Sequence, residues 1–295
     1  MFRNLRVRKQ PKKHAPEKER LPRDWLGQNA DVPTSLRQIN GLPDAAKKRI
    51  YRALVPPALL GRFGINPVTW KGPDGDGHVL LSARAGTGVA SIALRRRVGS
   101  GRDVFYLELE DTSMSGINLN FLLIRDPDGP CFHTDRDQEG NPTLFGTVHR
   151  NLDAEVQAMQ AGLAPGQVCQ GLRASQQVLQ HLEAFLVSNG HSAYFLEPLT
   201  YTSAWLFERR GFAYVRGHRL MDEIDREFQP GGRLHRALDG SSPFRQPDQW
   251  QSVRGRAWSI HDGILTAIGE SWDGLRMIWQ VGRHQGVETL QRCLN

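Results

Sequence analysis

The sequence has few cysteines and no long apolar run. Its 295 residues include three cysteines, Cys131, Cys169 and Cys293, which lie far apart and form no C-x-x-C pair. This spacing argues against a disulfide framework or a structural zinc site and is typical of a reducing cytoplasm. No segment reaches the roughly 18 apolar residues of a membrane span, and the N-terminus lacks the apolar core of a secretory signal. We therefore expect a cytoplasmic protein with no transmembrane segment and no bound metal.

Acidic residues are scarce only near the N-terminus. The chain carries 38 Lys and Arg against 31 Asp and Glu, and residues 1–23 hold nine of the basic residues but two of the acidic ones. The rest of the chain is therefore neutral. Three prolines and few apolar side chains predict that this tail is disordered in isolation. It is either a solubilising leader or an arm for an acidic partner, such as nucleic acid, an anionic membrane surface or an acidic protein.

Changes in hydrophobic period divide the remaining chain. Residues 24–77 are typical of a helical and loop segment. Within residues 78–222, six alternating segments up to residue 151 predict antiparallel strands, of which the third and fourth are the most apolar and should be central. Helix and strand periods then alternate up to residue 222, and residues 223–295 form a loop-rich extension that Trp250, Trp258 and Trp272 would pack onto the domain. The pattern predicts an α+β protein with a mixed, mainly antiparallel sheet covered by helices.

One stretch has a more specific pattern. A long helix that begins in a Gly-containing loop is followed by a short strand, a helix that ends in "FERRGF", and a last strand. Over residues 166–216 this order resembles the C-terminal half of the GNAT (N-acetyltransferase-like) acyltransferase superfamily. The resemblance implies a GNAT-like topology there, with an acyl-coenzyme A such as acetyl-CoA as the donor substrate. In that family the start of the long helix binds the coenzyme A pyrophosphate through free backbone amides.

The pyrophosphate loop of the family reads Gln or Arg, two residues, Gly, one residue, then Gly or Ala. Placed on "VCQGLRAS", the central glycine falls on Gly171, and the leading and last positions become Val168 and Arg173. Arg173 would obstruct close backbone approach, although its guanidinium could bind phosphate itself. An ordinary amphipathic helix start is the alternative interpretation. The resemblance thus implies cofactor contacts at Gln167, Val168, Gln170, Gly171, Arg173 and Phe207.

The ending "FERRGF" has two interpretations. The family usually has a Tyr four residues before the glycine, whose hydroxyl protonates the leaving thiolate, and here that position is Phe207. Tyr201 is the nearest hydroxyl that could replace it as a general acid. The other interpretation is structural, since Gly211 can end a helix in the left-handed conformation and bring Phe212 onto Phe207.

Further polar residues are candidates for catalysis or binding. Glu197 follows a strand, where ligands collect in such sheets, and it or His261 is the candidate base. Asp262 is adjacent to His261, which is a poor arrangement for a catalytic triad. The C-terminal loop also gathers cationic residues that suit a phosphate-bearing ligand, or else simply cover the core. These ligand candidates are Arg245, Arg254 and Arg256.

Four polar residues alternate in "CFHTDRDQEGN". His133, Asp135, Asp137 and Glu139 would share one face of a strand and could hold a divalent cation, but the twelfth-residue Glu of a calcium loop is missing. A solvated hairpin face is the favoured interpretation.

Two functions remain open at this point. The first is an acyl-CoA-dependent N-acyltransferase. The alternative is a catalytically inactive GNAT-fold binding or scaffold protein that uses its basic arm for an acidic partner. The sequence pattern sets no oligomeric state.

Overall fold

The computed structural model describes residues 33–96, 102–113, 115–146 and 149–290, so the basic residues 1–23 lie outside the described part. Within it, seven strands form one mostly antiparallel open sheet in the order β1-β2-β3-β4-β5-β7-β6. β4 and β5 pair in parallel. The α+β class and the central position of the third and fourth strands are therefore confirmed. The strands are β1 (Val79–Ser82), β2 (Val89–Arg95), β3 (Asp103–Asp111), β4 (Ile117–Ile124), β5 (Ala193–Leu196), β6 (Ala213–Arg216) and β7 (Arg276–Gln280).

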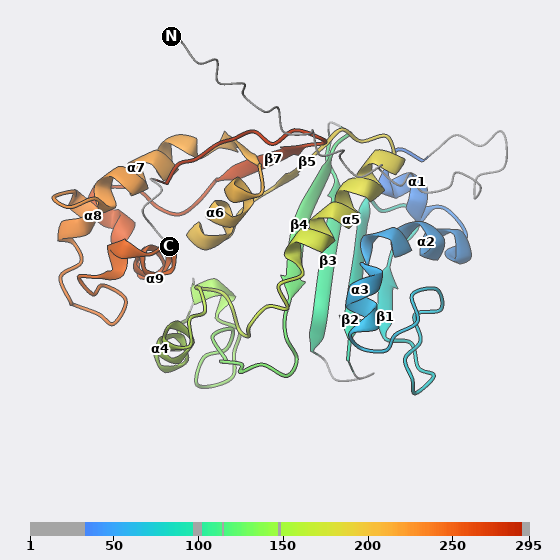
Figure 1. The fold of residues 1–295 in the computed structure, drawn as a ribbon, viewed down its shortest axis with the longest axis horizontal. Helices are drawn as coiled ribbons and strands as arrows, with labels where there is room; N and C mark the ends of the chain where they lie inside the picture. Colours follow the sequence, from blue (N-terminus) through green and yellow to red (C-terminus); the bar gives the residue numbers. More distant parts are fainter. Residues whose placement is uncertain (1–32, 97–101, 114, 147–148, 291–295) are drawn as a thin grey trace, which may run out of the picture.

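Helices on one side of the sheet enclose the main core. Leu60, Tyr51 and Phe185 from these helices are buried together with Leu107 of β3. Figure 1 shows α3 and α5 lying across β2, β3 and β4. Apolar side chains at helical spacing on α5 face the strands, as the sequence period predicted. The helices of this layer are α1 (Leu36–Asn40), α2 (Asp44–Tyr51), α3 (Pro57–Gly61) and α5 (Ser175–Ser188).

The sheet divides between β4 and β5. The two strands pair over three residues and their pairing ends at Leu119 and Leu196, whereas β4 continues to Ile124. On its other side β4 carries a bulge, because Leu119 and Phe121 pair with consecutive residues of β3 and Asn120 has no partner in that register. Figure 1 shows β5 and β7 extending away from β4. Among the residues that the structure describes, no strand pairs with the last residues of β4 on the β5 side, so this edge is free there.

A long insertion, residues 125–174, connects β4 to α5 and carries α4 (Leu152–Gln160). It packs against the C-terminal part of the chain, where Leu163 and Trp258 share a small apolar cluster. The Trp258 indole Nε1 donates to the Leu163 carbonyl at 2.9 Å. The helices beyond β5 are α6 (Tyr201–Arg209), α7 (His218–Phe228), α8 (Arg233–Arg236) and α9 (Val253–His261), and they form a second apolar cluster.

Two of the six expected strands are absent from the described residues. Residues 131–137 and 143–146 form isolated bridges and a short 3-10 helix, Leu144–Gly146, in place of paired strands. His133, Asp135 and Asp137 make one face of the first segment polar, and Leu144 of the second segment is exposed, so neither segment presents a buried apolar face to the sheet. The prediction of strands there was wrong.

The C-terminal region contains more helix than expected. The strand that follows "FERRGF" ends at Arg216, because Gly217 is left-handed and α7 begins at His218. Residues beyond 222 also include α9, whose N-cap Ser252 accepts from the Gly255 amide. The loop-rich prediction was wrong at these helices. After α9 the chain continues as the 3-10 helix Ile264–Ile268.

Cys131 and Cys169 form a disulfide across a sequence separation of 38 residues. The expectation against a disulfide was therefore wrong. The two cysteines lie opposite each other because the outgoing and returning limbs of the insertion run antiparallel at this point. Linear spacing does not reveal such a pairing. Within the described ranges no helix has the length and apolar content needed to cross a bilayer.

Candidate functional site at the start of α5

The start of α5 presents free backbone donors. Its N-cap residue is Ala174, which has no side chain able to cap, and no acidic residue occupies the first turn. The first intrahelical bond runs from the Val178 amide to the Ala174 carbonyl at 3.0 Å. The amides before Val178 therefore point out of the helix at its positive end, which is the arrangement that binds anions.

Arginines from three elements lie around these amides. Arg210, at the end of α6, places Nη2 3.4 Å from the Ser175 Oγ. Arg62, after α3, donates from Nη1 to the Leu172 carbonyl at 3.0 Å. Arg173 lies in the loop itself, with a φ of 56°. A set of guanidinium groups next to free amides suits phosphate oxygens.

The loop before α5 lies directly against the end of β4. The Asp126 amide donates to the Gln170 carbonyl at 2.7 Å. A Cβ on Gly171 would lie 3.3 Å from the Ile124 carbonyl, so the glycine permits a close approach to β4. The free edge of β4 therefore leads into the amides and arginines at the start of α5. An extended ligand with a phosphate group at one end fits this layout.

The structure separates the cofactor residues expected from the sequence into two groups. Gln170, Gly171 and Arg173 meet at the start of α5. Gln167 and Val168 precede the disulfide, where the Gln167 side chain accepts from the Ala164 amide and the Val168 carbonyl accepts from the Phe132 amide. These last two residues shape the returning limb of the insertion.

Phe207 belongs to the end of α6. Gly211 has a φ of 98°, and the Phe212 amide donates to the Phe207 carbonyl at 3.1 Å. The two phenyl rings meet edge to face with centroids 5.0 Å apart. The helix-capping interpretation of "FERRGF" is confirmed.

Tyr201 begins α6 and points into the second apolar cluster. Its side chain is 1% exposed, and its ring meets the Trp272 ring edge to face. Burial raises the pKa of Tyr201 to about 12, although the nearby Arg256 acts in the opposite direction. A hydroxyl enclosed in this way is poorly placed to exchange a proton with a bound substrate.

The two candidate bases lie in separate parts of the fold. Glu197 follows β5 directly and is exposed. His261 lies at the contact between α4 and α9, where its Nε2 is 3.1 Å from the buried Glu155 carboxylate. Arg150 pairs there with both Glu155 and Asp262. His261 is thus part of an ion-pair network that joins the insertion to α9.

The three C-terminal arginines do not act as one group. Arg245 donates from Nε to Asp262 at 2.9 Å. Arg256 is 0% exposed and pairs with Asp225 at 2.6 Å, so the fold itself occupies its guanidinium. Arg254 is exposed.

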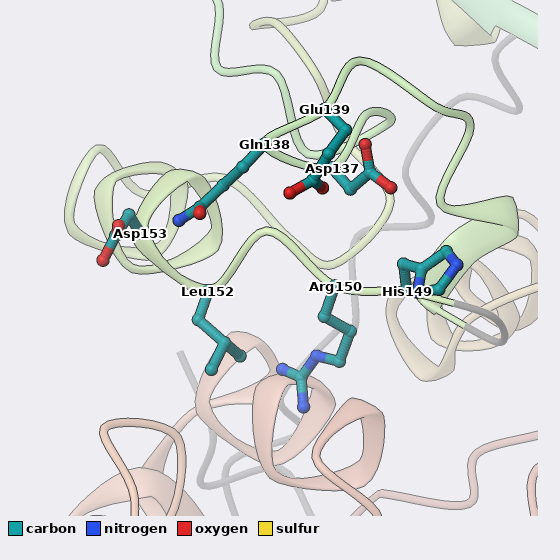
Figure 2. A pocket seen from close by; sticks show the side chains of 7 residues that line it. All are labelled: Asp137, Gln138, Glu139, His149, Arg150, Leu152 and Asp153. Atoms are coloured by element: carbon teal, nitrogen blue, oxygen red, sulfur yellow. The ribbon is translucent and has the colours of Figure 1, made fainter.

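A polar pocket of about 370 Å³ lies beside the ion-pair network. Figure 2 shows Asp137 and Glu139 on one side of it and Arg150 extending toward the C-terminal helices. Asp137 accepts from the Asn141 amide at 2.7 Å, which closes a turn. His133 and Asp135 are not among its lining residues, and no group able to hold a metal ion occurs in the part of the chain that the structure describes.

A scan against protein-family models, a search of curated proteins and a search of solved structures each found no match to this chain. Arg62 and Arg210 were not predictable as neighbours of α5, because they approach it from distant elements of the chain. The second arginine of "FERRGF" was visible in the sequence, but its neighbour across the fold was not.

Proposed function

We propose that this protein is an acyl-CoA-dependent N-acyltransferase with a GNAT-like arrangement of its sheet. The observation that carries the proposal is the divergence of β4 from β5 after Leu119, together with the uncapped start of α5 at the end of β4. The free edge of β4 offers amide donors and acceptors to a pantetheine chain. The amides at α5 would then hold the diphosphate.

The backbone at Arg173 supports a revised alignment of the pyrophosphate loop. The family pattern needs a glycine where the chain can turn left-handed, and Arg173 has a positive φ whereas Gly171 does not. With Arg173 at the glycine position, Gln170 becomes the leading Gln and Ser175 becomes the last small residue. Gln170 then agrees with the pattern, Ser175 is small although it is neither Gly nor Ala, and Arg173 supplies the left-handed backbone without being a glycine.

Each contact in the site has a distinct role in the proposal. The α5 amides bind diphosphate oxygens, and Arg210 adds a charge-assisted contact from α6. Glu197, exposed at the end of β5, accepts the proton of the incoming amine. The amine nitrogen attacks the thioester carbonyl carbon, the carbon–sulfur bond breaks, and coenzyme A leaves as a thiolate. Solvent protonates this thiolate, since Phe207 carries no hydroxyl.

Calorimetry with acetyl-CoA and longer acyl-CoA esters tests the proposal. We expect binding by the parent and a loss of about tenfold in affinity for Arg210→Ala, since one charged hydrogen bond is removed. Arg209→Ala is the matched control, because Arg209 is exposed and contacts the Trp205 ring instead. No heat at millimolar ligand would refute the coenzyme A site.

The clustered charge of residues 1–23 supports a second candidate function, an inactive scaffold that binds an acidic partner. Binding to DNA, RNA and anionic vesicles should be compared at two salt concentrations, with and without these residues. The scaffold predicts salt-sensitive binding that the deletion removes. Unchanged binding after the deletion would exclude the basic arm.

A further inference from the structure

The disulfide closes the neck of the insertion immediately before the proposed site. Cys169 is followed directly by Gln170, the first residue of the loop that leads into α5. Two backbone hydrogen bonds flank the disulfide, from the Phe132 amide to the Val168 carbonyl and from the Asp126 amide to the Gln170 carbonyl, each at 2.7 Å. The position of the loop is therefore fixed by the same contacts that join the two limbs.

The far end of the insertion is held independently of the disulfide. The Trp258 indole donates to the Leu163 carbonyl, and Glu155 pairs with His261 and Arg150. Cleavage of the disulfide would thus leave α4 docked on α9 and loosen the neck alone. The effect would reach the loop at Gln170 first.

The two sulfurs differ in access. Cys169 is 7% exposed, whereas Cys131 is partly exposed. A dissolved reductant therefore reaches the Cys131 side of the bond. We therefore expect thiol exchange on the Cys131 side of the bond without unfolding of the core.

We infer that the Cys131–Cys169 disulfide is a reversible redox latch, which keeps the loop from Gln170 to Ser175 in its coenzyme A-binding conformation when it is closed. The inference rests on the proposed function for its ligand. The opened form keeps the sheet, α4 and α9 in place, and binds coenzyme A more weakly.

A dithiol reductant supplies the chemistry. Its thiolate attacks the Cys131 Sγ, the Cys131–Cys169 bond breaks, and Cys169 leaves as a thiolate. The second thiol of the reductant then attacks the mixed disulfide and releases Cys131. Two electrons have passed to the protein, the reductant has become a disulfide, and two protons complete the cysteine thiols.

The main test compares coenzyme A affinity in the oxidised and the reduced protein. A Cys293→Ser parent removes the third thiol, and alkylation with mass spectrometry establishes the state of the other two. We expect the Kd to rise about tenfold on reduction and to recover on reoxidation, a coupling within the usual range between sites. Reciprocally, saturating coenzyme A should lower the midpoint potential of the disulfide by about 30 mV, which is that tenfold change for two electrons.

Amide hydrogen exchange provides a readout that does not need the ligand. Reduction should speed exchange at Asp126 and Phe132, while the amides of α9 keep their rates. The double variant Cys131→Ser with Cys169→Ser should match the reduced protein under oxidising conditions.

The outcomes separate the latch from the proposed function. Equal affinity and equal exchange in the two redox states overturn the latch, as does a protein in which the two cysteines never cross-link under oxidising conditions. If neither state binds coenzyme A, the proposed function and the ligand of the latch both fall, and exchange at the neck then shows only whether the disulfide orders the loop.

Discussion

Arg173 occupies a backbone conformation that side chains seldom adopt, with a φ of 56°. The left-handed region costs a non-glycine residue about 1 kcal/mol or more. We predict that Arg173→Gly is more stable than Arg173→Ala by about 1 kcal/mol in urea unfolding, since both variants lose the same guanidinium and only glycine relieves the backbone. If the alanine variant were as stable as the glycine variant, the backbone at position 173 would not be strained.

Arg256 was a ligand candidate in the sequence, but it has a structural role in the fold. Its fully buried guanidinium pairs with Asp225 and donates from Nε to the Trp250 carbonyl. Arg256→Met should destabilise the protein by about 3–5 kcal/mol, because it leaves a buried carboxylate without its partner. Adding Asp225→Leu should recover part of that loss in urea unfolding. Equal stability of Arg256→Met and the parent would mean that the pair is unimportant.

At the scale of elements, the contact between α4 and α9 depends on two ionised carboxylates. Burial alone would raise the pKa of Glu155, but hydrogen bonds from His261 and Arg150 outweigh it and lower the pKa. Burial likewise opposes a lowered pKa at Asp262, where Arg150, Ser242 and Arg245 donate. Both carboxylates therefore hold their protons less tightly in the folded state than in the unfolded state.

The sign of the pH effect follows from these lowered values. The ordinary pKa values are 4.5 for Glu155 and 3.8 for Asp262, and the stabilisation is present above them. We predict that it is lost as the pH falls below these values, because the unfolded chain takes up protons first. Between about pH 6 and about pH 3, the free energy of unfolding in urea should fall less steeply with decreasing pH for Glu155→Gln than for the parent. The same pH dependence of the free energy of unfolding in the variant and the parent would contradict a stabilising role for the Glu155 carboxylate.

Most of the helices and strands that were predicted from the sequence have apolar residues at regular spacing. The first four strands, α5 and the capped end of α6 follow from local patterns, since Gly211 and Phe212 need only their own neighbours. α7 was not predicted although Met221, Ile224 and Phe228 are spaced for a helix, because the helix begins only two residues after β6 ends. The disulfide and the position of Arg210 depend on contacts between distant segments, which no local pattern contains.

At the scale of the whole molecule, one sheet divides between β4 and β5, and the two parts are joined again through α4 and α9. The free edge of β4 and the start of α5 belong to the same side of this division. The proposed function requires that one ligand contact both of them. The second candidate function, a scaffold that binds an acidic partner through residues 1–23, requires no ligand at the sheet.

Amide hydrogen exchange with and without coenzyme A tests this central claim most directly. We predict slower exchange in the ligand-bound protein at residues 172–177 and at residues 120–124, with no change in α7. Protection that is absent from both segments at saturating coenzyme A, or that is confined to other parts of the chain, would contradict the account.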